Sequence, residues 1–144
     1  IRQVEQDRLN LSELIGYEVV GFAYPGGGVN HDDRVAEIIR KNTGIRYCRT
    51  ITSSYSFDIQ TDLYKFDPTV YHRVEFDKMI DLGHRFLKTK SEDPQIFYIW
   101  GHSYEFDFDD NWQKFEEFCS MMSGREDIFY GTNREVLLKV DEKV

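Results

Sequence analysis

Apolar positions along the chain switch between helical spacing and short continuous runs, which predicts alternating helices and buried strands. The first helix has an apolar stripe made by Ile1, Val4, Leu11, Leu14 and Ile15. Gly16 then provides a C-terminal stop for this helix. A mostly apolar run over 17–24 predicts the first strand, and its lack of strict alternation favours a strand that is buried on both faces.

The same alternation continues to residue 130. Asn30 is predicted to cap the second helix, and a long polar stretch over 52–71 predicts a functional loop. The remaining predicted strands cover 45–51, 96–100 and 128–130, and the remaining predicted helices cover 76–87 and 112–122.

Strands of this kind, alternating with helices, predict an α/β fold with parallel strands joined by right-handed crossovers. Either an arc of a barrel or an open sheet fits this pattern. The length of 144 residues suits a single domain over 1–144 with one sizeable core.

Composition narrows the possible partners. Hydrophobic residues make up 40% of the chain and charged residues 31%, which is typical of a globular domain. The net charge of -8 without a basic stripe argues against nucleic acid. Because no apolar run approaches the roughly 20 residues of a membrane span, none is predicted. Cys48 and Cys119 lie far apart in apolar stretches, which predicts two buried thiols and no disulfide.

Ligands of parallel α/β folds bind at the carboxyl ends of the strands, which selects three loops, 24–28, 52–72 and 101–107. The glycines in the first loop suit either a tight turn or a backbone N–H that faces a developing oxyanion. They do not match the phosphate-binding pattern G-x-x-x-x-G-K-[ST].

His102 is the most informative single residue, because a predicted buried strand delivers it to the functional edge. A histidine there suits a general acid or base near neutral pH, or a hydrogen-bonded structural role. Glu105 and Asp107 either orient the imidazole or are solvated loop charges. His72 and His31 are more typical of structural positions than of site residues.

Three segments resemble the polysaccharide deacetylase family, the NodB-homology carbohydrate esterases. They are Phe22-Ala23-Tyr24-Pro25-Gly26-Gly27, Asp67-Pro68-Thr69-Val70-Tyr71-His72 and Phe97-Tyr98-Ile99-Trp100-Gly101-His102-Ser103-Tyr104-Glu105-Phe106. The resemblance covers nearly the whole chain but only the C-terminal portion of the family's domain. It implies a partial (β/α) barrel that removes acetyl groups from N-acetylated amino-sugar polysaccharides or oligosaccharides, using water activated by a divalent metal such as zinc.

The resemblance also implies roles for single residues. Against the family's R-x-P-Y motif, Ala23 replaces the arginine, Pro25 matches, and the Gly26 N–H faces the oxyanion. Against the L-x-H motif, Trp100 walls the acetyl-methyl pocket and His102 protonates the leaving amine. Three further residues of the resembling segments are assigned to substrate binding together with Trp100, namely Tyr24, Tyr104 and Glu105.

Two motifs of the family, T-F-D-D and H-x-x-x-H, are absent, and the stretch from Asp58 to Asp62 lacks the tryptophan of D-x-x-D-W. The chain also lacks H-E-x-x-H and His-x-His, so no metal site is predicted within it. We therefore expect the metal ligands to lie outside this chain and the segment alone to be inactive. A sheet without its first strands exposes unpaired edges, which predicts self-association.

A non-catalytic carbohydrate-binding module of the same descent is the alternative interpretation. Its sugar-stacking rings would be Tyr55, Phe57, Tyr64, Phe66, Tyr71, Tyr104 and Phe106, unless these rings simply pack the loop down. A glycosidase that uses Glu105 and Asp107 is less favoured, because residues two apart on an extended segment point to opposite sides.

Overall fold

A computed structural model of the chain describes residues 1–141, with side chains as far as 138. The described residues form two compact units. The first unit comprises 1–51, 60–66 and 130–141, and the second comprises Thr52–Ile59 and Asp67–Phe129. The prediction of a single domain stays a prediction.

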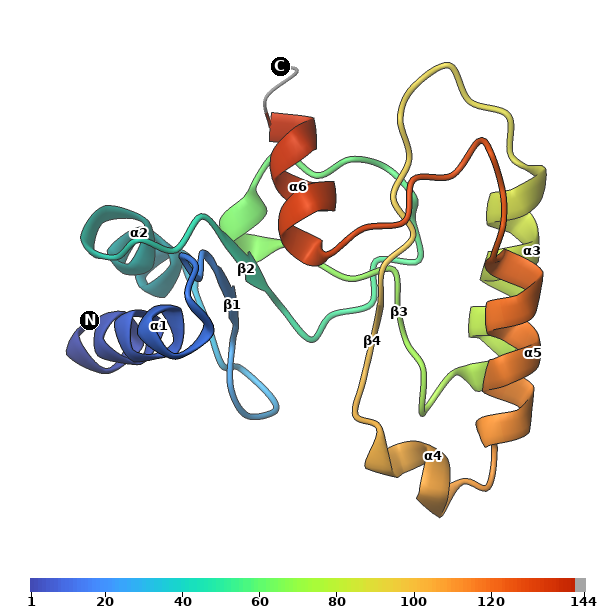
Figure 1. The fold of residues 1–144 in the computed structure, drawn as a ribbon, viewed down its shortest axis with the longest axis horizontal. Helices are drawn as coiled ribbons and strands as arrows, with labels where there is room; N and C mark the ends of the chain where they lie inside the picture. The colour runs from blue at the N-terminus through green and yellow to red at the C-terminus, as the bar shows by residue number, and fades with distance from the viewer. Residues whose placement is uncertain (142–144) are drawn as a thin grey trace. The chain divides into compact units, whose positions relative to one another are not determined.

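Each unit contains one pair of parallel strands, with a helix between the two strands in the chain (Figure 1). The predicted α/β character and the parallel pairing are therefore confirmed. Residues 1–141 contain no closed barrel, since the paired strands form two separate two-stranded sheets.

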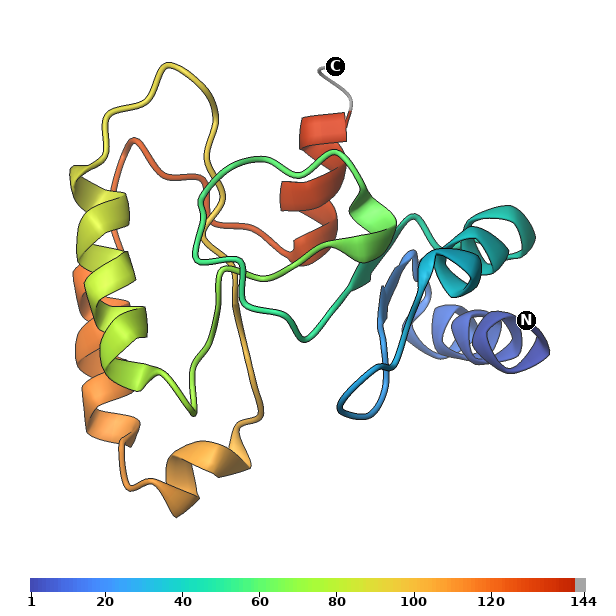
Figure 2. The same cartoon turned by 180° about the vertical axis from the view of Figure 1, so that it is seen from behind.

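The first unit is built on β1 (Gly21–Ala23), α2 (Asp33–Asn42) and β2 (Tyr47–Arg49). The two strands lie side by side in Figures 1 and 2, with Gly21 opposite Tyr47. Gly21 is needed there, because a Cβ atom would lie 2.3 Å from the Tyr47 hydroxyl oxygen. The strand predicted over 17–24 is shorter in the structure, where β1 covers only Gly21–Ala23. A 3-10 turn, η1 (Leu63–Lys65), also belongs to this unit.

The cap of α2 differs from the prediction. Asp32 is the N-cap, and its carboxylate accepts a hydrogen bond of 2.7 Å from the Val35 N–H. The Asn30 side-chain amide instead donates to the carbonyls of Tyr24 and Gly26, at 3.2 and 3.1 Å. The prediction of Asn30 as the cap is wrong, because its amide closes the glycine turn.

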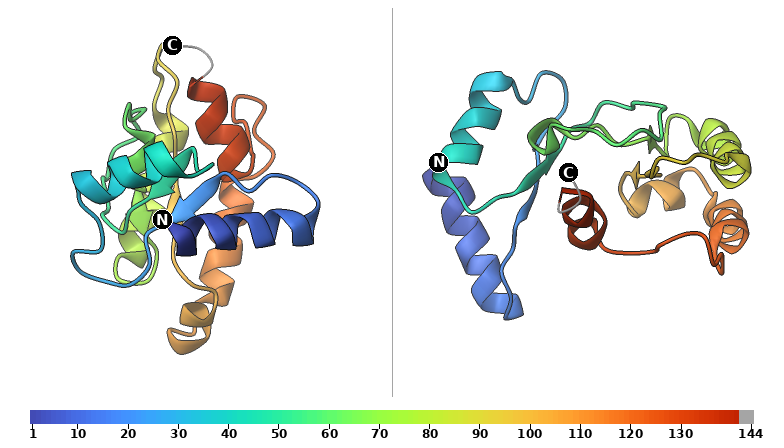
Figure 3. Two further views of the ribbon diagram at one scale, coloured as in Figure 1. Left: turned by 90° about the vertical axis from the view of Figure 1, so that its left-hand side faces the viewer. Right: turned by 90° about the horizontal axis from the view of Figure 1, so that it is seen from above.

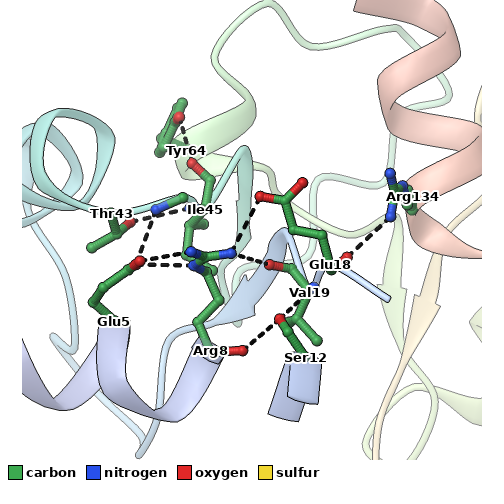
Figure 4. Close-up of polar contacts among 10 residues, drawn as sticks. Glu5, Arg8, Ser12, Glu18, Val19, Thr43, Ile45, Tyr64 and Arg134 are labelled. Carbon is green, nitrogen blue, oxygen red and sulfur yellow. Dashed lines mark hydrogen bonds and ion pairs between the residues drawn. The ribbon is translucent and has the colours of Figure 1, made fainter. Parts of the chain in front are cut away.

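The first helix, α1 (Arg2–Ile15), is anchored by charge (Figure 4). The Arg8 guanidinium donates to both carboxylate oxygens of Glu5, at 2.7 and 2.9 Å, and to the Val19 carbonyl at 3.3 Å. Glu5 also accepts a hydrogen bond from the Gly44 N–H at 3.0 Å. Most of the predicted apolar stripe is solvent-exposed, and only Val4 packs against the core. The helix ends at Gly16 as predicted, with φ of 77°.

The chain after residue 130 forms a helix, α6 (Asn133–Asp141), and the strand predicted over 128–130 is absent. Thr132 and Glu135 form a capping box. The Glu135 carboxylate accepts from the Thr132 N–H at 2.8 Å, while the Thr132 hydroxyl accepts from the Glu135 N–H at 3.3 Å. The T-x-x-E spacing is a signal in the sequence that predicts this helix, and our sequence analysis missed it.

The second unit contains β3 (Val70–Tyr71), α3 (Phe76–Lys88), β4 (Ile99–Trp100), α4 (Tyr104–Phe108) and α5 (Trp112–Met122). Its core is made by Phe57, Val70, Met79, Leu82 and Phe118. Helices α3 and α5 lie side by side in all views, including those of Figure 3.

Close helix packing places one cysteine differently from the prediction. Phe115, Phe118 and Met122 form the inward face of α5, and the Phe118 ring approaches Gly83 of α3. Cys119 lies beside that stripe and is exposed, whereas Cys48 is buried as predicted. The prediction of a buried Cys119 is wrong, because Phe118, one position earlier, is the residue that faces α3.

None of the helices described within 1–141 has the length and apolar character needed to cross a membrane.

Replacement of Thr132 by alanine tests the capping box. We expect Thr132→Ala to destabilise α6 by about 1 kcal/mol, because the Glu135 N–H loses its acceptor. Amide hydrogen exchange of α6 measures the loss, with Thr52→Ala as a control at an exposed threonine of the other unit. Unchanged exchange rates in α6 would contradict the capping box.

Candidate functional site

The site is organised by a buried carboxylate, that of Glu105, whose side chain is only 3% exposed. It lies in the first turn of α4, directly after β4. One carboxylate oxygen, Oε1, accepts a hydrogen bond from the Tyr71 hydroxyl at the end of β3. The other, Oε2, accepts from the His102 N–H at 2.9 Å. Burial of a carboxylate is costly unless such donors surround it, so the ends of both strands are required.

Two imidazoles flank the same carboxylate. His102 Nδ1 lies 3.3 Å from Oε1, and His72 Nε2 lies 3.2 Å from Oε2. The Arg73 guanidinium lies farther away, 3.9 Å from Oε1, and 3.3 Å from the Asp109 carboxylate. Glu105 is therefore placed between two histidines that differ strongly in exposure.

The His72 ring is packed tightly from both sides. It stacks on Phe106 with 4.2 Å between ring centroids and 10° between planes. A Cβ atom on Gly101 would lie 1.9 Å from His72 Cδ2, and Gly101 has φ of 156°. Only glycine fits this position without a shift of the backbone or the ring.

The buried groups have shifted pKa values. Burial lowers the pKa of His72, which keeps this imidazole neutral at pH 7. Burial alone would raise the pKa of Glu105, but hydrogen bonds from Tyr71 and His102 lower it overall. Burial and the hydrogen bond to Glu105 raise the pKa of Tyr71 to about 12. At neutral pH the cluster thus holds an ionised carboxylate, a neutral His72 and a protonated Tyr71.

The outer edge of the cluster is accessible. The His102 side chain is 52% exposed, and its ring stacks on Tyr104 at 5.2 Å between centroids. Tyr104 is itself exposed, and so is Phe108 one helical turn further along α4. Trp100 is partly buried and stacks on Tyr71 at 4.4 Å. A half-exposed imidazole over a buried carboxylate has the geometry of an oriented proton donor or acceptor.

The structure brings together four of the six predicted site residues, namely Trp100, His102, Tyr104 and Glu105, in the second unit. Tyr24 and Gly26 belong to the first unit. Gly26 is exposed in a turn with φ of 79°. Its assignment to an oxyanion contact stays a prediction.

Tyr24 is a core residue of the first unit. It is 3% exposed, its hydroxyl donates to the Tyr64 carbonyl at 2.9 Å, and its ring stacks on His31. The structure therefore gives no support to its assignment to substrate binding. Its neighbour His31 has the structural role that the sequence favoured.

The seven rings predicted to stack on sugars differ in exposure. Phe57, Phe66 and Phe106 are buried, Tyr64 and Tyr71 are partly buried, and Tyr55 and Tyr104 are exposed. The interpretation that these rings pack the loop down is thus supported for the three buried rings.

The segment after Gly101 was expected to be extended, but Tyr104–Phe108 is helical. Glu105 is nevertheless buried while Asp107 is exposed and accepts a hydrogen bond from the Trp112 ring N–H at 2.7 Å. Positions two apart on a helix also point to different sides. The two carboxylates do not flank a common space, which argues against the glycosidase interpretation.

The described residues offer no ligand set for a metal ion: no cluster of three or more His, Cys, Asp or Glu side chains among them is placed to hold one. Glu105 illustrates the reason, since both of its oxygens already accept hydrogen bonds. The metal that the family resemblance implies therefore does not fit these residues. Two surface hollows are lined by residues of the first unit, and none of the six predicted site residues lines either hollow.

Of the residues around Glu105, Tyr71 was predicted from the sequence only as a sugar-stacking ring, His72 was predicted to be structural, and Arg73 was not predicted. The stretch 52–71 was predicted to be a loop, so the short strand β3 that ends at Tyr71 became evident only in the structure. That β3 and β4 are neighbours likewise becomes evident only from their pairing, Tyr71 opposite Trp100.

No family model, curated protein or solved structure matches this chain.

Replacement of Gly101 by alanine tests the close packing of His72. We expect Gly101→Ala to destabilise the second unit by about 2–4 kcal/mol, because the new methyl group overlaps the buried ring and the φ angle is unfavourable. Urea unfolding followed by tryptophan fluorescence reports on this unit, because Trp100 and Trp112 are the chain's two tryptophans. Gly27→Ala is the control, since nothing lies within 4 Å of its added Cβ. The same urea midpoint for Gly101→Ala and Gly27→Ala would contradict the close packing of His72 against Gly101.

Acid should destabilise the second unit in two stages. Folding lowers the pKa of His72, so protonation of this ring favours the unfolded state. The second unit therefore has its full stability above pH 6.5 and becomes less stable as the pH falls below that value. Because the pKa of Glu105 is also lowered, its contribution is lost as the pH falls below about 4.5.

Glu105→Gln should remove the second stage and keep the first. It should also lower stability at pH 7 by about 1.5–3 kcal/mol, since hydrogen bonds to a charged acceptor are lost. Urea unfolding between pH 3 and 7 measures both effects, and a second stage that persists in the variant would assign it to another group.

Proposed function

We propose that the chain is the C-terminal portion of a polysaccharide deacetylase-like hydrolase, which removes N-acetyl groups from amino-sugar polymers or oligosaccharides. The two strand–helix–strand segments would be part of a (β/α) barrel of the NodB-homology type. The observation that carries the proposal is the half-exposed His102 imidazole, with Nδ1 beside the buried Glu105 carboxylate. Its exposed position beside Trp100 and Tyr104 supports the same assignment.

Hydrolysis of an N-acetyl group breaks an amide C–N bond, and the departing nitrogen must receive a proton. His102 suits this step because Glu105 stabilises a proton on Nδ1, which leaves Nε2 to deliver one to the amine. Water activation by a divalent metal would depend on ligands outside this chain.

The exposed rings of α4 favour a second candidate, a carbohydrate-binding module. Tyr104 and Phe108 are 52% and 71% exposed, and their ring centroids lie 5.7 Å apart. Aromatic faces of this kind suit the apolar face of a sugar ring. In the module interpretation Tyr104 would be essential for binding and His102 dispensable.

Acetate release from an N-acetylglucosamine oligosaccharide, with zinc added, tests the first proposal. The protein is the chain together with any residues that its gene encodes before Ile1. We expect His102→Ala to lower kcat about 10²–10⁴-fold, the usual contribution of a positioned acid. His84→Ala is the matched control, an exposed histidine on α3.

Full acetate release by His102→Ala would overturn the role of His102 as the acid. Metal-independent binding of the oligosaccharide by the chain itself, abolished by Tyr104→Ala and unaffected by His102→Ala, would favour the module. A calorimetric titration measures that binding.

A further inference from the structure

His72 is a buried histidine that lies beside the Glu105 carboxylate. It is near one carboxylate oxygen, and His102 is near the other. The His72 side chain is 4% exposed, and Nε2 lies 3.2 Å from Glu105 Oε2. His102 Nδ1 lies 3.3 Å from Oε1 of the same group. One carboxylate therefore connects a buried histidine with an exposed one.

The chemistry of this contact determines which nitrogen of His72 carries the proton. A neutral imidazole has one N–H and one bare nitrogen. A bare Nε2 would place its lone pair against an ionised carboxylate, whereas an Nε2–H is attracted to it. The contact with Oε2 therefore favours the Nε2–H form.

Packing alone does not account for a histidine at this position. The ring is enclosed by Phe106 and Gly101, and such a site would accept an apolar ring at a lower desolvation cost than an imidazole. Nε2 of the ring lies 3.2 Å from Oε2, the oxygen that also accepts the His102 N–H, although the contact is outside hydrogen-bond geometry. These contacts hold Oε2 on the inner side and leave Oε1 to Tyr71 and His102 Nδ1.

We propose that His72 is a positioning residue for His102: the electrostatic attraction between its Nε2–H and Glu105 Oε2, 3.2 Å away, keeps Oε1 turned toward His102 Nδ1. The neutral His102 ring then carries its proton on Nδ1, and Nε2 is the atom that takes up and delivers a proton. The inference rests on the proposed function for the role of His102 as an acid. The tautomers of both histidines follow from the geometry alone.

The ¹⁵N chemical shifts of the imidazole nitrogens test the proposal in the chain itself, without substrate or metal. The spectra are recorded at about pH 8, because the protonated and the bare nitrogen of a neutral imidazole have different shifts. We expect His72 in the Nε2–H form and His102 predominantly in the Nδ1–H form. Bare Nε2 on His72 in the wild-type chain would overturn the proposal.

Three variants separate positioning from packing. His72→Met removes the donor and keeps an apolar side chain, and we expect the ratio of Nδ1–H to Nε2–H in His102 to fall about threefold or more. His72→Gln places an amide N–H near the same oxygen and should retain most of the Nδ1–H form. Glu105→Gln should shift the ratio at least as far as His72→Met, and His84→Met should leave it unchanged.

An unchanged His102 ratio in a folded His72→Met variant would overturn the proposal. If this variant does not fold, as judged by tryptophan fluorescence, the wild-type tautomer of His72 and the His72→Gln variant decide. The two proposals fail in different ways. If only the proposed function is wrong, acetate release is absent and the predicted tautomers are still observed.

Discussion

The second unit depends on one constraint, the burial of the Glu105 carboxylate. Removal of a charged carboxylate from water costs several kcal/mol unless donors replace the water. Those donors come from the end of β3, from the turn after β4 and from the side chain of His102. The two strand ends and α4 must therefore meet at one point, where the absence of a side chain at Gly101 leaves room for the His72 ring.

The first unit also contains a largely buried charged side chain, which in this case is positive. The Arg8 side chain is only 10% exposed, and it is satisfied by Glu5 and by the Val19 carbonyl (Figure 4). This anchor attaches α1, while most of the apolar stripe of that helix remains exposed. Periodicity predicted the helix correctly and its buried face incorrectly, because a polar network determines how this helix is attached.

The arrangement around Glu105 separates two tasks. On the buried side Tyr71 donates a hydrogen bond to the carboxylate and His72 lies 3.2 Å from it, and the exposed side presents His102 and Tyr104. A proton donor that is accessible from outside suits the amide hydrolysis that we propose. In that proposal the family resemblance and the geometry favour the same residue, His102, from different observations. The Glu105 contact to His102 also lies within a single short segment, so it does not depend on how the two units are placed.

The sequence by itself indicated an α/β chain with parallel strands, because helical spacing and short apolar runs are local properties, but it placed β3 within a predicted loop and predicted a strand over 128–130 that the structure lacks. It also held the T-x-x-E spacing that predicts α6. Only the tertiary structure decided that Tyr24 is a core residue, that Glu105 is buried and that His72 shares its carboxylate. The physical reason is that burial and ion pairing depend on neighbours distant in the chain. His72 and Glu105 are 33 positions apart, and the pairing of β3 with β4 brings them together.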